Sequence, residues 1–345
     1  MSGPSERAMP TDEVREAIGQ RPQDEAASRW SSVRSFLTKN YLLVIVVVLM
    51  LVVGMLRPSF WGSGNLNNVM FQTAFVGIAA CGMTILIAGG LIDLSVGGVI
   101  AVSSIALAMV LPTSTVGGAI GVALVIGAAG GLISGLLVTY VKIAPFIATL
   151  GTQYLFLGLA FIVTGGKVIP VKSSAYRSMM TGSLGVVPIP FLVFVVLALI
   201  TAFLLHRTYF GRTVRAFGSN ERAAQLAGMA VNRAKVLVFV FAGVCFALCG
   251  AFMTARLSSA EGNMAIGYEM DVIAAVVIGG TALRGGRGTM LGTFLGAILF
   301  TVITNAMNLL GVASYWQYVL TGVILIAAIA VASFGSRDGA VRGEG

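Results

Sequence analysis

The chain has 345 residues, of which 57% are hydrophobic and only 10% are charged, and its formal net charge is +9. Soluble domains carry about 25% charged residues, so this composition excludes an ordinary soluble fold and indicates a chain that lies mostly in lipid. The excess of Lys and Arg would favour nucleic acid binding in a soluble protein. Here these residues fall between long apolar runs, where they set membrane topology, so nucleic acid binding is excluded as well.

Residues 1–39 are polar, with three prolines and mixed charges. Such a segment cannot bury enough apolar area to fold alone, so we predict a disordered cytoplasmic tail. No small-residue cleavage site follows the first apolar run, which is therefore predicted to be a retained span. The transmembrane domain is predicted to cover residues 40–334 and to be followed by a cytoplasmic C-terminal tail, residues 335–345.

Ten apolar segments follow one another along this domain, each close to the roughly 20 residues that a helix needs to cross a bilayer. We therefore predict an all-α, polytopic membrane protein with about ten transmembrane helices. The eighth segment is the weakest, because its uncharged stretch runs only from Val272 to Leu283, and it could instead be a half-helix or a re-entrant loop. The segments are 40–56, 69–88, 92–111, 116–139, 145–165, 186–205, 236–256, 270–283, 289–311 and 316–334.

The distribution of basic residues favours ten crossings with both termini in the cytoplasm. With the N-terminus inside, ten crossings divide the 22 Lys and Arg residues into 17 cytoplasmic and 5 external ones, whereas a re-entrant eighth segment gives 13 and 9. The stronger asymmetry agrees better with the positive-inside rule. Trp61 and Trp316 fall at predicted interfaces, where tryptophan anchors membrane helices.

Glycines recur at four-residue intervals in two segments. Such rows form smooth ridges along a helix face and let helices approach closely in lipid. The spacing alone leaves open whether these ridges meet within one chain or between two copies. The rows are Gly127, Gly131 and Gly135, and Gly288, Gly292 and Gly296.

The sequence contains no recognisable source of energy for transport. It lacks the G-x-x-x-x-G-K-[ST] loop that binds nucleotide phosphates. Ion-coupled carriers keep ionisable residues at mid-membrane, where each costs at least ~2.5 kcal/mol, but the predicted spans hold almost none. We therefore expect either a partner that supplies the energy or passive transport.

The sequence also argues against an enzyme, because one histidine and scattered serines supply no nucleophile paired with a base. Cys81, Cys245 and Cys249 lie in apolar segments with no second pair or histidine nearby, and are predicted to be packing residues. We expect no catalytic residue, no metal and no cofactor bound by the chain itself.

The main cytoplasmic loop, residues 206–235, holds six Lys and Arg residues against the single acid Glu221. Ser219 and Asn220 are typical helix N-caps, and Gly228 can end a helix, so the loop is predicted to contain a short exposed helix. The loop could be a simple basic connector. A capped helix with small side chains is more specific than a connector requires, and it would suit a docking site for a cytoplasmic partner.

Two glycine-rich stretches interrupt the apolar pattern. In the first, Gly89 and Gly90 precede Asp93 and Ser95, which could cap the next helix or could belong to a broken helix that lines the solute route. In the second, Ile278–Gly280 echoes Ile87–Gly90, so a duplicated architecture is possible. Since polar groups in lipid-embedded helices tend to face a cavity, we expect a substrate path near Asp93, Ser95, Asn305, Asn308 and Gln317, although each could instead be a cap or an interhelical hydrogen bond.

At these stretches the chain resembles the permeases of ribose-type monosaccharide ABC importers. The residues that carry the resemblance are Ile92–Gly97 after the glycine pair, Gly218–Asn220 through Gly228, Met270–Ala275 through Gly288, and Asn305–Gly311. The family pattern usually places the acid two residues after the glycine pair. Here Leu91 and Ile92 both intervene, and an extra residue in a helix would rotate the residues after it by about 100°.

The resemblance implies a bacterial inner-membrane permease for a monosaccharide or related polyol. It implies two permease copies or close homologues in the membrane, a cytoplasmic ABC ATPase that binds the ATP, and a periplasmic sugar-binding protein. The alternatives are a permease of a branched-chain amino acid importer and a stand-alone facilitator or channel. The residues implied in contact with the ATPase are Arg215, Gly218, Asn220, Ala223, Ala224 and Gly228.

Overall fold

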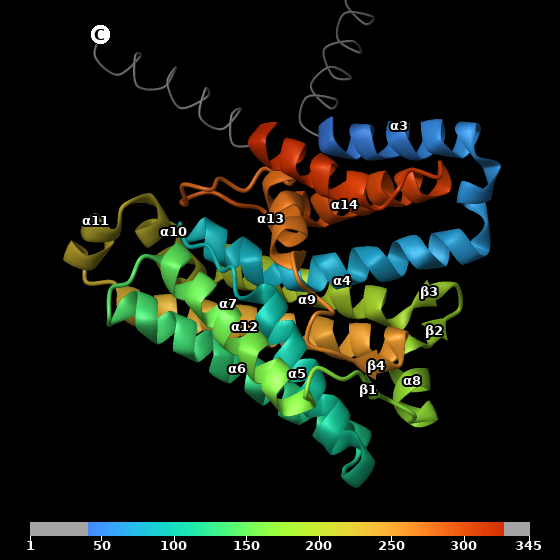
Figure 1. Ribbon diagram of the computed structural model, residues 1–345. Coiled ribbons are helices and arrows are strands. Elements are labelled where there is room, and N and C mark those ends of the chain that lie inside the picture. The colour runs from blue at the N-terminus through green and yellow to red at the C-terminus, as the bar shows by residue number, and fades with distance from the viewer. Residues whose placement is uncertain (1–40, 328–345) are drawn as a thin grey trace, which may run out of the picture.

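The computed structural model describes residues 41–327, so the two predicted tails and residues 328–334 of the last predicted span lie outside the described residues. Within this range the chain is a helical bundle with two short antiparallel β-pairs at one end (Figure 1). The helices are α3 (Tyr41–Leu56), α4 (Ser63–Ala88), α5 (Val96–Val110), α6 (Val116–Thr139), α7 (Pro145–Thr164), α8 (Ser174–Thr181), α9 (Ile189–Arg207), α10 (Tyr209–Ser219), α11 (Glu221–Leu226), α12 (Val231–Leu257), α13 (Tyr268–Ile278) and α14 (Met290–Leu309), followed by a helix over Tyr315–Ala327.

Short elements join the helices. Pro58–Trp61 and Leu111–Thr113 are single 3-10 turns. Strand β1 (Ile169–Pro170) pairs with β4 (Ser259–Ala260), and β2 (Ser183–Leu184) forms a hairpin with β3 (Val187–Pro188). These strands and α8 lie at the end of the bundle opposite to α11 (Figure 1).

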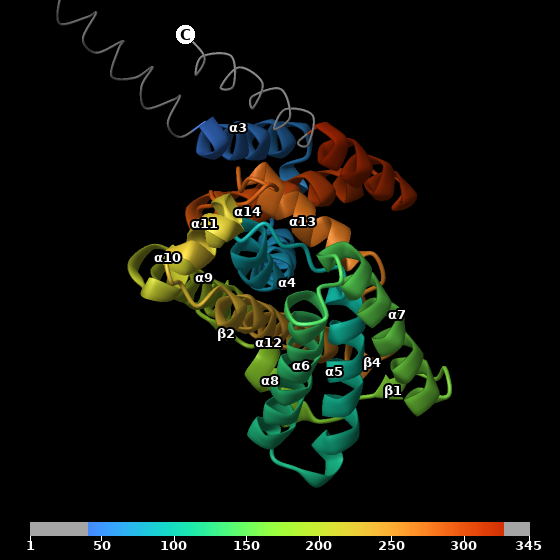
Figure 2. The ribbon, with the colours of Figure 1, turned by 90° about the vertical axis from the view of Figure 1, so that its left-hand side faces the viewer.

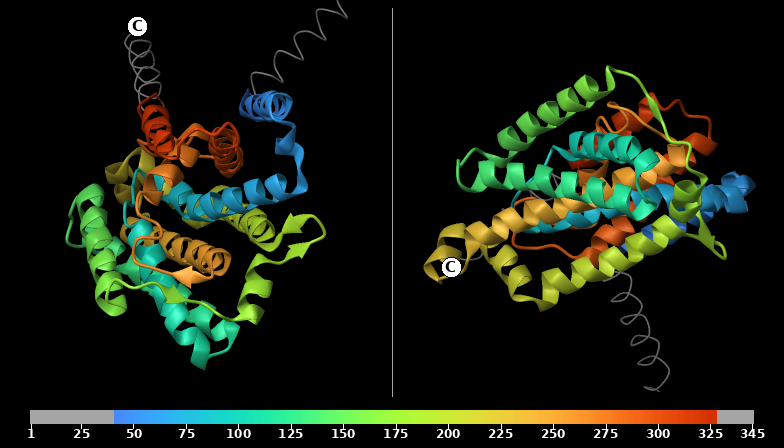
Figure 3. Two further views of the ribbon diagram at one scale, coloured as in Figure 1. Left: turned by 45° about the vertical axis from the view of Figure 1, so that its right-hand side comes forward. Right: turned by 90° about the horizontal axis from the view of Figure 1, so that it is seen from below.

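Seven of the described helices are long and apolar enough to cross a membrane. They are α4, α5 with its 3-10 extension, α6, α7, α9, α12 and α14, and they match seven of the ten predicted segments. The chain is therefore a polytopic, all-α membrane protein. α4 is the most enclosed of the seven, and α12 contacts α4, α5 and α6 as it passes through the bundle (Figure 3).

Three predicted segments form shorter apolar helices within the described range. α3 has 16 residues, and the helix that begins at Tyr315 is described to Ala327. α13 has only 11 residues, which is about 16 Å of helix against roughly 30 Å of hydrocarbon. The eighth predicted segment, 270–283, is thus helical only as far as Ile278, and its remaining residues, 279–283, belong to a non-helical stretch that runs on to residue 289.

Both glycine rows meet helices of the same chain. A Cβ at Gly131 would collide with the carbonyl oxygen of Phe239, and one at Gly127 with that of Gly243, so the first row lies against α12. In the second row, Gly292 and Gly296 lie against the backbone of α13, as the predicted ridge requires. Gly288 is the exception, because it precedes α14 and packs on Thr281 in the connecting loop.

Replacing Gly131 with alanine is expected to destabilise the folded chain by about 1–3 kcal/mol, because the added methyl group meets fixed backbone and not a movable side chain. Gly121 lies in the same helix with nothing within 4 Å of an added Cβ, so Gly121→Ala is the matched control. Thermal unfolding in detergent measures both. Equal melting temperatures for the two variants would contradict this packing.

α4 and α13 end in the same way. At the end of α4 the Gly90 N–H donates to the Ile87 carbonyl and the Leu91 N–H to the Leu86 carbonyl, both at 2.9 Å. At the end of α13 the Gly280 N–H donates to Val277 at 2.9 Å and the Thr281 N–H to Val276 at 3.3 Å. Gly90 and Gly280 have φ of +70° and +83°, the left-handed conformation that such a C-cap needs. The similarity that the sequence indicates between the two stretches therefore extends to their backbone conformation.

Residues 91–95 are non-helical and almost fully buried between α4 and α5. The predicted rotation of about 100° by an extra residue is therefore wrong at this position, because no helix runs through residues 91–95. Leu91 and Ile92 instead lengthen the non-helical stretch. Buried backbone without helical hydrogen bonds is tolerated at membrane depth only where protein encloses it, and here the neighbouring helices do so.

Candidate functional site

One end of the bundle brings together the ends of α4 and α6, the starts of α7 and α12, and the helices α10 and α11. We call it the inner end; Figure 2 views the molecule from this side. α10 is amphipathic, with Val214 and Phe217 buried against the bundle. α11 projects beyond the other helices (Figure 1).

α11 forms where the sequence predicts a short helix. The Asn220 carboxamide oxygen accepts from the Ala223 N–H at 3.0 Å, which caps its first turn. After its last turn Gly228 has φ +73°, and its N–H donates to the Gln225 carbonyl at 3.0 Å. The predicted start and stop signals of this helix are confirmed.

The predicted coupling residues take different positions around α11. Ala223 is exposed, whereas Ala224 is buried at 5% exposure against the rest of the inner end. A bulky side chain at Ala224 would therefore disturb packing inside this chain before it reached a partner. Leu226 is 83% exposed, and is the most prominent apolar side chain on this helix. Arg215, on α10, is half-buried, and its Nε atom has no hydrogen-bond partner within the described residues.

Gly218 lies where three distant segments touch. A Cβ there would collide with the Ala88 carbonyl oxygen, and would lie 2.8 Å from the Gly286 nitrogen and 2.9 Å from the Gly89 Cα. The Gly286 N–H donates to the Ala88 carbonyl at 2.8 Å. We call this contact between Gly89–Gly90, Gly218 and Gly285–Gly286 the glycine junction. It joins the base of α11 to the break that leads into α5 and to the loop after α13.

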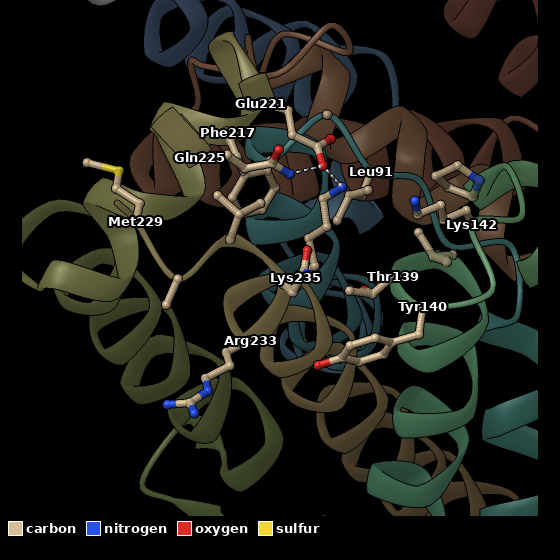
Figure 4. Close-up of a pocket in the computed structure, with 18 of the residues that line it drawn as sticks. Leu91, Thr139, Tyr140, Lys142, Phe217, Glu221, Gln225, Met229, Arg233 and Lys235 are labelled. Carbon is tan, nitrogen blue, oxygen red and sulfur yellow. Dashed lines mark hydrogen bonds and ion pairs between the residues drawn. The ribbon is translucent and has the colours of Figure 1, made fainter. Parts of the chain in front are cut away.

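A cavity of about 1110 Å³ opens beside the glycine junction. Four basic residues line it, Lys142, Arg233, Lys235 and Arg284, together with the acid Glu221. The Glu221 carboxylate accepts from Lys235 Nζ at 2.6 Å and from Gln225 Nε2 at 3.1 Å (Figure 4). This ion pair ties α11 to the beginning of α12.

Asp93 and Ser95 lie in the buried non-helical stretch before α5. The Asp93 carboxylate accepts from the Ser95 backbone N–H at 2.7 Å and from its hydroxyl at 2.6 Å. The side-chain cap of α5 comes from another helix, because the Gln153 carboxamide oxygen accepts from the Gly98 N–H at 2.6 Å. Gln153 is eight residues into α7, or about 12 Å from its start, so α5 begins well inside the bundle.

A second pocket, of about 210 Å³, lies between α4, α12, α13, α14 and the last described helix, and we call it the outer pocket. It reaches from the end of α14 to residues near the middle of α4 and α14, and it includes the predicted path residues Asn308 and Gln317. Gln317 Nε2 donates to Asn308 Oδ1 at 2.8 Å. The lining residues are Gln72, Phe75, Val76, Met253, Tyr268, Asp271, Phe300, Thr301, Thr304, Asn308 and Gln317.

The other predicted path residues do not line the outer pocket. Asn305 exchanges two hydrogen bonds with Asn65 of α4, at 2.8 and 3.1 Å, and so links the end of α14 to the start of α4. Asp93 and Ser95 belong to the local turn before α5. The structure therefore brings Asn308 and Gln317 together and leaves Asp93, Ser95 and Asn305 elsewhere.

Comparison with known proteins agrees with this architecture. Residues 65–329 match the family model described as the permease component of the branched-chain amino acid transport system. The ribose import permease of Bacillus subtilis is 42% identical over 289 residues, which cover 82% of this chain and 88% of that protein. The Escherichia coli ribose import permease is 36% identical over 86% of this chain and 96% of its own length, and the Escherichia coli L-arabinose permease is 34% identical over 84% and 88%.

The chain belongs to the family of ribose-type ABC permeases. The resemblance inferred from the sequence motifs is thereby confirmed.

Sequence reasoning missed several polar residues of this permease that the structure brings together. Gln153 and Asn65 carry no local motif, and their roles depend on contacts with helices far away in the chain. Gln72 and Asp271 of the outer pocket were also missed as path residues. Asp271 did stand out as one of two acids at the start of a weak span, and that isolated carboxylate was the available signal.

Proposed function

We propose that this permease is the membrane-spanning subunit of an ATP-driven importer for a monosaccharide or related polyol. The observation that carries the proposal is the similarity to ribose and L-arabinose permeases over more than four-fifths of the chain. The projecting, capped helix α11 and the absence of a phosphate-binding loop from the sequence support an external source of energy.

In this proposal α11 contacts a cytoplasmic ABC ATPase, which binds the ATP, and the chain itself carries no catalytic residue, metal or cofactor. A periplasmic binding protein delivers the sugar to the opposite end. A second copy of the permease, or a close homologue, completes the translocation path in the bacterial inner membrane. The inner end then faces the cytoplasm, in agreement with the basic residues of the loop over residues 206–235.

We further propose ten crossings with both termini in the cytoplasm, within a transmembrane domain over residues 40–334. The eighth crossing would consist of α13 and the backbone after it, which reaches the inner end where Gly286 donates to Ala88. A crossing that is only partly helical is compatible with lipid when protein covers its backbone. α4 and α14 pack against α13 here.

Uptake into proteoliposomes that contain the complete permease–ATPase complex tests the function. With ATP and the binding protein present, D-ribose or L-arabinose is expected to accumulate, and L-leucine is not. Leucine is included because the matching family model is named for branched-chain amino acids. Accumulation of leucine alone would favour the amino acid alternative, and sugar flux that continues without ATP would favour a stand-alone facilitator.

A further inference from the structure

We infer that the outer pocket is a binding station for the solute in transit, and that its chemistry selects a neutral, polyhydroxylated ring over an amino acid. This inference rests on the proposed function, because it presumes that a small solute passes through the permease. Its evidence is separate, and comes from the side chains that five helices place around one pocket.

Within the described residues, the polar side chains of the outer pocket have spare hydrogen-bonding capacity. A carboxylate offers about four acceptor sites on its two oxygens. Within the described residues, Thr321 is the donor that reaches Asp271, with its Oγ1 3.3 Å from Oδ1. The Asn308 and Gln317 amides share one hydrogen bond, which leaves most of their donors and acceptors for a solute. The pocket therefore combines an anionic acceptor with amide groups of both kinds, which suits vicinal hydroxyl groups.

Part of the lining of the outer pocket is apolar. Phe75 and Phe300 lie near the middle of α4 and α14, and Val76 and Met253 complete the apolar surface. Pockets for small molecules are typically apolar with a few placed polar groups, and aromatic rings supply large, rigid contact area. A sugar ring presents C–H groups on its faces and hydroxyl groups at its edge, so it matches such a mixed lining.

The charges that line the outer pocket also affect which solute it can bind. None of the described residues that line the outer pocket is Lys or Arg, whereas the cavity beside the glycine junction has four such residues. An amino acid could pair its ammonium group with Asp271, but no Lys or Arg of the described lining would pair with its carboxylate. The partial positive charge at the N-terminus of α13 would stabilise the solute carboxylate little, because Glu269 and Asp271 already occupy the first turn of this helix. A zwitterion bound in the pocket would thus keep one unpaired charge on its carboxylate, so the pocket favours a neutral solute over a zwitterion.

A cysteine at Thr304 allows binding to be measured directly. Thr304 lines the pocket, and its hydroxyl donates only to a carbonyl of its own helix, that of Thr301, at 3.0 Å. Thr113 is a matched control, since it is exposed at the far end of α5 and its hydroxyl likewise bonds its own helix, at the Val110 carbonyl. The three native cysteines are buried and provide a low background.

The permease complex with Thr304→Cys, reconstituted in lipid, is treated with a small hydrophilic thiol reagent in the presence of D-ribose, L-arabinose or L-leucine.

A bound sugar is expected to slow the modification of Thr304→Cys about threefold at twice its dissociation constant, by simple occupancy. L-leucine is expected to leave the rate unchanged, and no solute should protect Thr113→Cys. Adding Asp271→Asn to Thr304→Cys should abolish protection by the sugar while the rate without solute stays the same. That unchanged rate would show that the double variant keeps its fold.

Other outcomes would overturn the inference. Protection by leucine equal to that by the sugars would refute the charge argument, and no protection by any solute would refute the station. If the sugar still protects Thr304→Cys in the presence of Asp271→Asn, the Asp271 carboxylate does not take part in solute binding. ATP-driven uptake by the wild-type complex is measured in parallel. If the wild-type complex takes up sugar but no solute protects Thr304→Cys, the binding station is refuted and the proposed function is retained. If the wild-type complex takes up no solute, the proposed function itself is refuted.

Discussion

Gly218→Ala is expected to reduce ATP-driven uptake by roughly tenfold or more, because it separates segments that must move as one body. The glycine junction has no room for a methyl group at this position, since the atoms it would meet are backbone atoms of Ala88, Gly89 and Gly286. The base of α11 would be displaced from the break before α5. Force applied to α11 by a partner would then reach the solute path less effectively.

The measurement compares uptake with ATP hydrolysis in the same reconstituted complex. Both rates are normalised to the amount of assembled complex, and Gly218→Ala should lower the uptake per ATP hydrolysed, which a mere loss of folded complex could not do. Gly151→Ala is the control, because Gly151 lies in α7 with nothing within 4 Å of an added Cβ. Uptake by Gly218→Ala within twofold of the control would exclude the glycine junction from coupling.

Leu226→Asp is expected to release the ATPase from the permease. Leu226 is 83% exposed at the end of α11, and burying such a side chain in a partner's groove contributes about 1.5–3 kcal/mol, a factor of roughly 10–100 in affinity. A charge at the same position would add a desolvation cost. α11 itself should persist, because its cap at Asn220 and its buried Ala224 are unchanged.

Copurification of the ATPase with the permease measures this loss. Val186→Asp is a matched control, since Val186 is equally exposed, at 83%, in the β2–β3 turn at the opposite end of the molecule. ATPase binding should be lost in Leu226→Asp and retained in Val186→Asp. Retention in both would show that α11 does not contact the ATPase through its apolar end.

The sequence predicted the helical architecture well because apolar length and capping residues are local signals. The seven long helices, the cap at Asn220 and the stop at Gly228 were each read from a few neighbouring residues. Both glycine rows were also predicted, and the structure adds that they pack within one chain. The error in the second row, at Gly288, arose because four-residue spacing continues across a helix start that periodicity cannot detect.

The candidate sites were predicted less completely, since they depend on contacts between distant segments. Polar residues in spans were read as path residues, but Asn305 proved to be paired with Asn65, 240 positions away. Conversely, Gln72 became a pocket residue only through the arrangement of α4 beside α13 and α14. The break before α5 was located correctly, yet its non-helical conformation and the cap that Gln153 supplies to α5 needed the tertiary structure.

The glycine junction also bears on how the protein is made. Ala88 is synthesised nearly two hundred residues before Gly286, whose N–H it accepts. Gly218 reaches the inner end of α4 first, and Gly286 completes the contact only after most of the remaining chain has left the ribosome. Contacts so distant in sequence form late and expose unfinished surfaces to misassembly. A chain truncated before Gly286 would therefore leave the glycine junction without one of its three segments.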